Sequence, residues 1–136
     1  MRPTIRVAAL LLLTLLTACR TLGVSPDQFD RTSREYNHMV RWQEYAMANV
    51  TFVDKGTREA YLKKLEAARD VRVVDFRALS YECDPEKGTA TVEVEFDYYV
   101  MPSNRVKTVR DTQKWVYREG KQDSGWRLTT LLPDFP

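Results

Sequence analysis

The 136-residue chain is poor in the residue types on which most protein chemistry depends: it has two cysteines, one histidine and five glycines. The single histidine, His38, has no second His or Cys at ligand spacing, so we expect no metal. The glycines stand singly in turns, which excludes a phosphate-cradling loop, and there is no G-x-S-x-G motif. With none of these motifs, we expect no cofactor. Beyond residue 18 no run of Lys and Arg exceeds two residues, so we also expect no nucleic-acid partner.

Long apolar runs are also scarce, and the clearest one lies at the start of the chain. An apolar stretch over residues 7–16, which only Thr14 interrupts, follows the basic residues Arg2 and Arg6. A run this short cannot cross roughly 30 Å of hydrocarbon, which takes about 20 residues. A basic flank, a short apolar core and small residues after it are typical of a secretory signal. The alternative, a core helix, fits the position and the flank badly.

The end of this segment carries a second motif. Residues 16–19 read Leu-Thr-Ala-Cys, which resembles the lipobox of bacterial lipoproteins. The resemblance implies cleavage before Cys19, a diacylglyceryl group on its sulfur and an acylated amine. Residues 1–18 are then a removed signal peptide, and residues 19–25 are the lipidated cysteine with a short tether.

The same resemblance implies where the protein is anchored. In lipoproteins of the enterobacterial type an aspartate after the cysteine favours retention in the inner membrane, and Arg20 stands there instead. We therefore expect a protein anchored to a bilayer through Cys19 and facing the periplasm, at the outer rather than the inner membrane. Lipidation of Cys19 leaves Cys83 unpaired, either as a small hydrophobe at the end of a strand or, with no C-x-x-C motif to support it, in a redox or intermolecular role.

The first half of the remaining chain has the periodicity of helices. Ser25 before Pro26 and an acidic first turn predict a helix start, and an apolar stripe continues at spacings of three and four to about Asn49. A short β-prone run follows over residues 50–53. A second helix is expected to begin after Thr57 and to end near Arg69.

The second half reads as an antiparallel meander, which makes residues 26–136 a single α+β domain. Strands are expected over residues 72–83, 89–101, 105–118 and 126–132, with clean alternation in the second. Trp42 and Tyr45 are expected to widen the apolar face of the first helix. The predicted core comprises Tyr36, Val40, Met47, Val92, Val94, Phe96, Tyr98, Trp115, Trp126 and Leu128.

This order of elements, with the closing hairpin Gln-Lys-Trp-Val-Tyr at residues 113–117 and Gly-Trp-Arg-Leu at residues 125–128, resembles the nuclear transport factor 2-like (SnoaL-like) superfamily. The resemblance implies helices packed on a strongly curved antiparallel sheet of four to five strands, which forms a cone with a pocket. The superfamily holds both enzymes and binding modules, so the fold alone does not assign a function.

One polar pair stands out within the predicted sheet. If residues 102–103 form a tight turn, Glu95 lies opposite Arg110 and Thr91 opposite Lys114, on the solvated face. Asp111 and Gln113 then point inward with Tyr98, where polar groups need hydrogen bonds or a wet pocket. The alternatives are a bulged strand or a position of Asp111 at the open rim, in contact with water.

Two classes of function follow from these residues. The first is a non-catalytic binding or scaffold module for a small hydrophobic ligand or an envelope protein, with the sheet face available for a homodimer. The second is an enzyme of the isomerase or dehydratase kind, with Asp111 as base and Tyr98 or Gln113 as hydrogen-bond donor. Because no partner carboxylate or histidine accompanies Asp111, the sequence favours the binding module.

Overall fold

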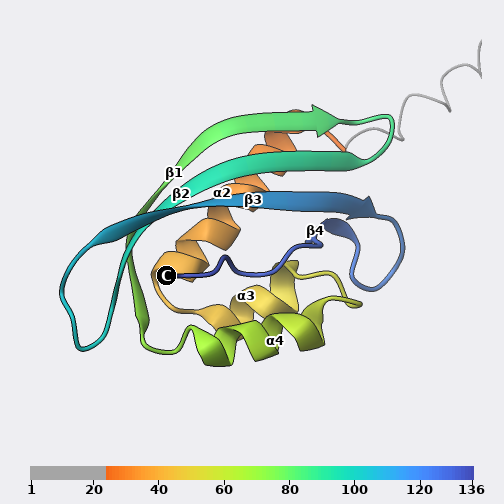
Figure 1. The fold of residues 1–136 in the computed structure, drawn as a ribbon. Coiled ribbons are helices and arrows are strands. Elements are labelled where there is room, and N and C mark those ends of the chain that lie inside the picture. Colours follow the sequence, from red (N-terminus) through yellow and green to blue (C-terminus); the bar gives the residue numbers. More distant parts are fainter. Residues whose placement is uncertain (1–23) are drawn as a thin grey trace, which may run out of the picture.

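The computed structural model describes residues 24–136, which form an α+β domain with three helices packed against an open, four-stranded antiparallel sheet (Figure 1). The strands follow one another in space as they do in sequence, in the order β1-β2-β3-β4. The signal segment and Cys19 lie outside the described residues. None of the helices within residues 24–136 is long and apolar enough to span a membrane. The elements are α2 (Pro26–Arg41), α3 (Tyr45–Phe52), α4 (Arg58–Ala67), β1 (Val71–Asp84), β2 (Thr89–Val100), β3 (Lys107–Arg118) and β4 (Gly125–Leu128).

The first helix begins as predicted and ends earlier than predicted. The Ser25 hydroxyl accepts a hydrogen bond from the Gln28 amide at 3.1 Å, as an N-cap does. The expectation of one helix to Asn49 was wrong, because Gln43 has a positive φ of 61° and stops α2. The backbone N–H groups of Gln43 and Glu44 donate to the carbonyls of Val40 and Met39, which is the Schellman pattern of a helix end.

This break rotates the next helix relative to the first. Helix α3 turns Ala48 and Phe52 inward, whereas Met47 is 59% exposed and Trp42, at the end of α2, is 68% exposed. The predictions that Met47 joins the core and that Trp42 widens the buried face were therefore wrong. All the other predicted core residues are buried.

The segment between the helices also differs from the prediction. Most of the expected strand over residues 50–53 is the end of α3, and only Val53 makes a β-bridge, in parallel with Leu128. The following helix begins after Thr57 as expected. The last strand is shorter than predicted and ends at Leu128 rather than at residue 132.

The register of the sheet agrees with the prediction where β2 meets β3. Glu95 lies opposite Arg110, Thr91 lies opposite Lys114, and the pairing runs without interruption. The edge strand β1 is less regular: Val74 and Leu79 each have no counterpart on β2, so the strand bulges twice. Both bulged side chains are more than two-fifths exposed.

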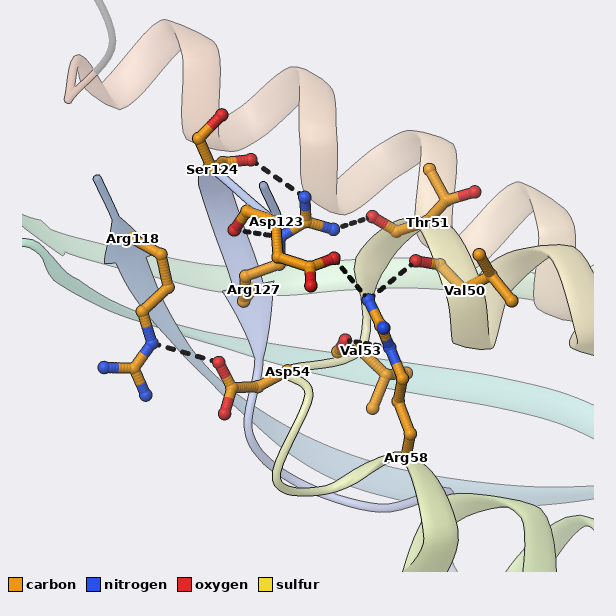
Figure 2. Close-up of polar contacts among 9 residues, drawn as sticks. All are labelled: Val50, Thr51, Val53, Asp54, Arg58, Arg118, Asp123, Ser124 and Arg127. Atoms are coloured by element: carbon orange, nitrogen blue, oxygen red, sulfur yellow. Dashed lines mark hydrogen bonds and ion pairs between the residues drawn. The ribbon is translucent and has the colours of Figure 1, made fainter. Parts of the chain in front are cut away.

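Two arginines, here called the arginine clamp (Arg58 and Arg127), tie the β3–β4 turn to the helices (Figure 2). Arg58 donates to the carbonyls of Val50 and Val53 at 3.0 and 3.2 Å, and to the Asp123 carboxylate at 2.6 Å. Arg127 donates to the carbonyl of Thr51 on α3 and to the carbonyls of Asp123 and Ser124 in the β3–β4 turn. The last carbonyls of a helix lack intrahelical partners, so the two guanidiniums satisfy the negative end of α3.

Replacing Arg58 with glutamine should therefore destabilise the domain by about 1–3 kcal/mol, because the carbonyls at the end of α3 and the Asp123 carboxylate would lose their charged donor. Urea denaturation followed by tryptophan fluorescence measures this change. Arg118→Gln is the matched control: Arg118 is more exposed and makes a single surface ion pair with Asp54, at 3.0 Å. Its loss should cost less than about 1 kcal/mol. Equal effects of the two substitutions would contradict the clamp's role.

Candidate functional site

Asp111 lies on the helix-covered side of the sheet, in the middle of β3. It faces Val94 across an unbroken ladder and is 9% exposed. A bulge is therefore not what turns this side chain inward, and the carboxyl is not at a water-filled rim. The alternation of β3 alone brings an acid into the interior.

Gln113 binds this carboxyl, and Asn37 in turn binds Gln113. Gln113 Nε2 donates to Asp111 Oδ2 at 3.2 Å and to Asn37 Oδ1 at 2.8 Å, and Asn37 Nδ2 donates back to Gln113 Oε1 at 3.2 Å. The second Asn37 N–H donates to the carbonyl of Ser33, one turn earlier on α2, at 2.9 Å. All four amide N–H groups are used, so the network links α2 to β3 without a free donor.

The burial of Asp111 changes its acidity. Removal from water raises the pKa of its carboxyl to about 6, and the hydrogen bond from Gln113 opposes this only in part. A single neutral donor cannot replace the hydration of a carboxylate, which is why the protonated form is favoured. A pKa of about 6 lies within the range in which general bases operate near neutral pH.

Tyrosine hydroxyls surround the same region. The hydroxyls of Tyr36 on α2 and Tyr61 on α4 lie 2.9 Å apart in a hydrogen bond between the two helices. Burial raises the pKa of both, and the nearby Asp111 charge raises each further. The hydroxyl of Tyr45 is buried with no hydrogen-bond partner in residues 24–136. These groups are neutral and supply no second base.

Tyr98 does not lie beside Asp111. It is four residues along β2 from Val94, the partner of Asp111, which corresponds to about 13 Å along the strand. Its hydroxyl donates to the Pro136 carbonyl at 2.6 Å, and its ring contacts Phe135 with centroids 4.9 Å apart. Of the residues predicted for the site, the structure thus brings together Asp111 and Gln113 and leaves Tyr98 elsewhere.

Sequence reasoning missed the helical half of the network. Ser33 and Asn37 are spaced i and i+4 on the buried face of α2, a face on which polar residues need partners. That spacing was the available signal. The pairing of Tyr61 with Tyr36 depends on how α4 docks against α2, which no residue pattern indicates.

Other chemistry finds little support in the described residues. His38 lies on the exposed side of α2 with its ring edge-on to Phe76, and residues 24–136 contain no cluster of His, Cys, Asp and Glu arranged to hold a metal. Cys83 is half-buried and unpaired, and burial raises the pKa of its thiol, which lowers its reactivity. Five pockets in this part of the chain are lined by residues other than Asp111, Gln113 and Tyr98.

Comparisons with protein-family models, with curated proteins and with solved structures yield no match to this chain.

Proposed function

We propose that the protein is a bacterial lipoprotein, held in a membrane through acylated Cys19 and facing the periplasm. The Leu-Thr-Ala-Cys motif at residues 16–19, behind a basic and apolar leader, supports this proposal. Helix α2 begins at Pro26, so the tether is about six residues and spans at most roughly 20 Å. The domain would therefore stay close to the bilayer, and Arg20 after the cysteine favours the outer membrane.

The domain itself is proposed to be a non-catalytic binding or scaffold module for a small hydrophobic ligand or an envelope protein. The observation that carries this is the enclosure of Asp111: its carboxyl is nearly buried, and both N–H groups of its hydrogen-bonding neighbour Gln113 are taken, one by Asp111 and one by Asn37. A proton-transfer enzyme needs its base within reach of a bound substrate. The nuclear transport factor 2-like cone is proposed as the finer description of the fold, supported by helices on one face of a four-stranded meander.

The opposite face of the sheet bears on the proposed homodimer. Arg77 bridges Glu95 and Asp97 at 3.1 and 2.7 Å, and Arg110 reaches Glu95 at 3.1 Å. Surface pairs of this kind contribute little each, but together they satisfy the charges of the face within one chain. A homodimer through this face would be polar and sensitive to salt.

Replacement of Cys19 by serine tests the anchoring. The wild-type chain should incorporate labelled palmitate and sediment with membranes, because two or more acyl chains anchor stably where one is marginal. The Cys19→Ser chain should incorporate no label and should be released or persist as an uncleaved precursor. Cys83→Ser is the matched control and should behave as the wild type does. Acylation of the Cys19→Ser chain would refute the proposal.

The raised pKa of Asp111 favours a second candidate, an isomerase or dehydratase with Asp111 as base and Gln113 as hydrogen-bond donor. This candidate needs motion of α2 to admit a substrate, since the network closes over the carboxyl. Turnover that disappears in the Asp111→Asn variant would favour the enzyme over the binding module.

A further inference from the structure

Residues 129–136, here called the strap, cross the helix-covered side of the domain without regular secondary structure (Figure 1). The Thr129 amide donates to the Lys114 carbonyl, but within residues 24–136 no backbone–backbone hydrogen bond is made by residues 130–136. Pro133 and Pro136 have no N–H to donate. Each contact of the outer part of the strap therefore involves a side chain of the strap or of the domain, and Leu132 is its buried anchor.

The tip of the strap covers an aromatic surface on β2. The Phe135 ring lies against Tyr98 and Phe96, at centroid distances of 4.9 and 6.5 Å. Both rings of β2 are fully buried beneath it. Detachment of the strap would therefore expose an apolar floor while breaking no backbone ladder.

Two lysines and a hydroxyl surround this floor. The Lys107 ammonium donates to the Pro136 carbonyl at 2.8 Å, and the Tyr98 hydroxyl donates to the same oxygen at 2.6 Å. Lys64 on α4 makes an ion pair with Asp134. The strap thus presents a ring, a carboxylate and an acceptor oxygen. The domain binds the ring with the aromatic rings of β2, and it binds the two oxygen groups with the ammonium groups of Lys64 and Lys107.

An unfilled space continues from the ring site. A cavity of about 210 Å³ lies between the strap and the helices, lined by Lys64, Ala67, Ala68 and Val71 and by residues 133–136. The lining is apolar except for Lys64 and Asp134. A molecule larger than the phenyl ring would therefore have room beside it.

We propose that the strap occupies a ligand site of this domain, and that the ligand is an aryl carboxylate. The proposal deepens the proposed function, since it rests on the domain being a module for small hydrophobic ligands. The aryl group replaces Phe135 on Tyr98 and Phe96, and the carboxylate replaces the Pro136 main-chain oxygen between Lys107 and the Tyr98 hydroxyl. An aryl carboxylate presents the same two groups as the tip of the strap, a ring and an oxygen acceptor, and a ligand larger than the phenyl ring also gains contacts in the cavity, so it can compete with a strap tethered at high effective concentration.

Binding of 3-[4-(trifluoromethyl)phenyl]propionate, followed by fluorine NMR, tests this site on the full chain in phosphatidylcholine nanodiscs. The Phe135→Ala variant should bind the probe about tenfold more tightly than the wild type, because the competing ring is gone. In the Phe135→Ala background, where the strap competes least, Lys107→Gln should weaken binding by about tenfold, the loss expected for one charged contact. Lys87→Gln, at the β1–β2 turn, is the matched control and should change nothing.

The proposal is overturned when Phe135→Ala binds no more tightly than the wild type, or when Lys107→Gln and Lys87→Gln have equal effects. Tyr98→Phe removes one hydroxyl and keeps the ring, so it serves where circular dichroism shows that Phe135→Ala is unfolded. Unchanged affinity in Tyr98→Phe then counts against the site. Empty nanodiscs identify probe that partitions into lipid, and signal equal to theirs is also a negative result.

The two proposals fail separately. If Cys19 carries palmitate but the probe does not bind at the strap, the ligand site is refuted and the anchored module stands. If the probe binds at the strap in a chain that carries no lipid, the membrane anchor is refuted and the ligand site stands.

Discussion

Replacing Trp126 with alanine should destabilise the domain by about 3–5 kcal/mol, the usual range for a large aromatic side chain in a core. Trp126 is 3% exposed and lies between Phe29 and Tyr117, at centroid distances of 5.1 and 5.5 Å. Its indole N–H has no hydrogen-bond partner in residues 24–136, so the substitution removes packing and no hydrogen bond within the domain. Urea denaturation monitored by far-ultraviolet circular dichroism measures the loss.

Trp42→Ala is the matched control for this prediction. The residue type is the same, but Trp42 is 68% exposed and its ring contacts the Arg41 guanidinium at 5.4 Å. Its removal should change the stability by no more than about 1 kcal/mol, since exposed cation–π contacts are worth about 0.5–1 kcal/mol. A comparable loss for Trp42 and Trp126 would show that the core is not where the structure places it.

Asparagine in place of Asp111 should stabilise the domain at neutral pH. The folded-state pKa of Asp111, about 6, lies above the unfolded value of about 3.9, so the native state keeps this proton longer. The wild type therefore loses stability as pH rises from about 4 to about 6 and then levels off. Asparagine has no such proton and can still accept from Gln113. The gain should be close to zero at pH 4 and reach up to about 3 kcal/mol at pH 7.

The measurement is a series of urea denaturations across this pH range, with Asp97→Asn as a control of opposite sign. Hydrogen bonds from Arg77 and Thr108 lower the pKa of Asp97, so its carboxylate stabilises the domain at neutral pH, and that contribution disappears as pH falls through its folded-state pKa. Asp97→Asn should thus destabilise the domain, most of all at neutral pH. A gain for Asp111→Asn that is the same at pH 4 and at pH 7 would contradict the buried, proton-holding carboxyl.

The strands were easier to predict than the helices, for a physical reason. Strict alternation of apolar and polar residues in β2 leaves one register that buries the apolar set, and the pairing of Glu95 with Arg110 follows from it. The end of α2 carries no such signal. Glutamine rather than glycine takes the left-handed position at residue 43, and the apolar spacing continues past it.

The site was predicted in the part that depends on one strand. The alternation of β3 placed Asp111 and Gln113 inside, but the partners of Gln113 come from α2, and the position of a helix against a sheet is a tertiary property. The separation of Tyr98 from Asp111 instead follows from the strand register, because Val94 pairs with Asp111 and Tyr98 lies four residues further along β2. Both face inward, yet which acceptor the Tyr98 hydroxyl finds depends on the course of residues 129–136, which has no periodic pattern.

The two bulges in β1 also determine how this domain behaves among copies of itself. β1 is a long strand at the edge of the sheet, and an edge strand offers its free backbone groups to any strand that can lie flat against it. Val74 and Leu79 interrupt that ladder, so an incoming strand would lose its register within a few residues of any starting point. A chain that we propose to be anchored to a membrane surface thereby has an edge that resists polymerisation into a continuous sheet.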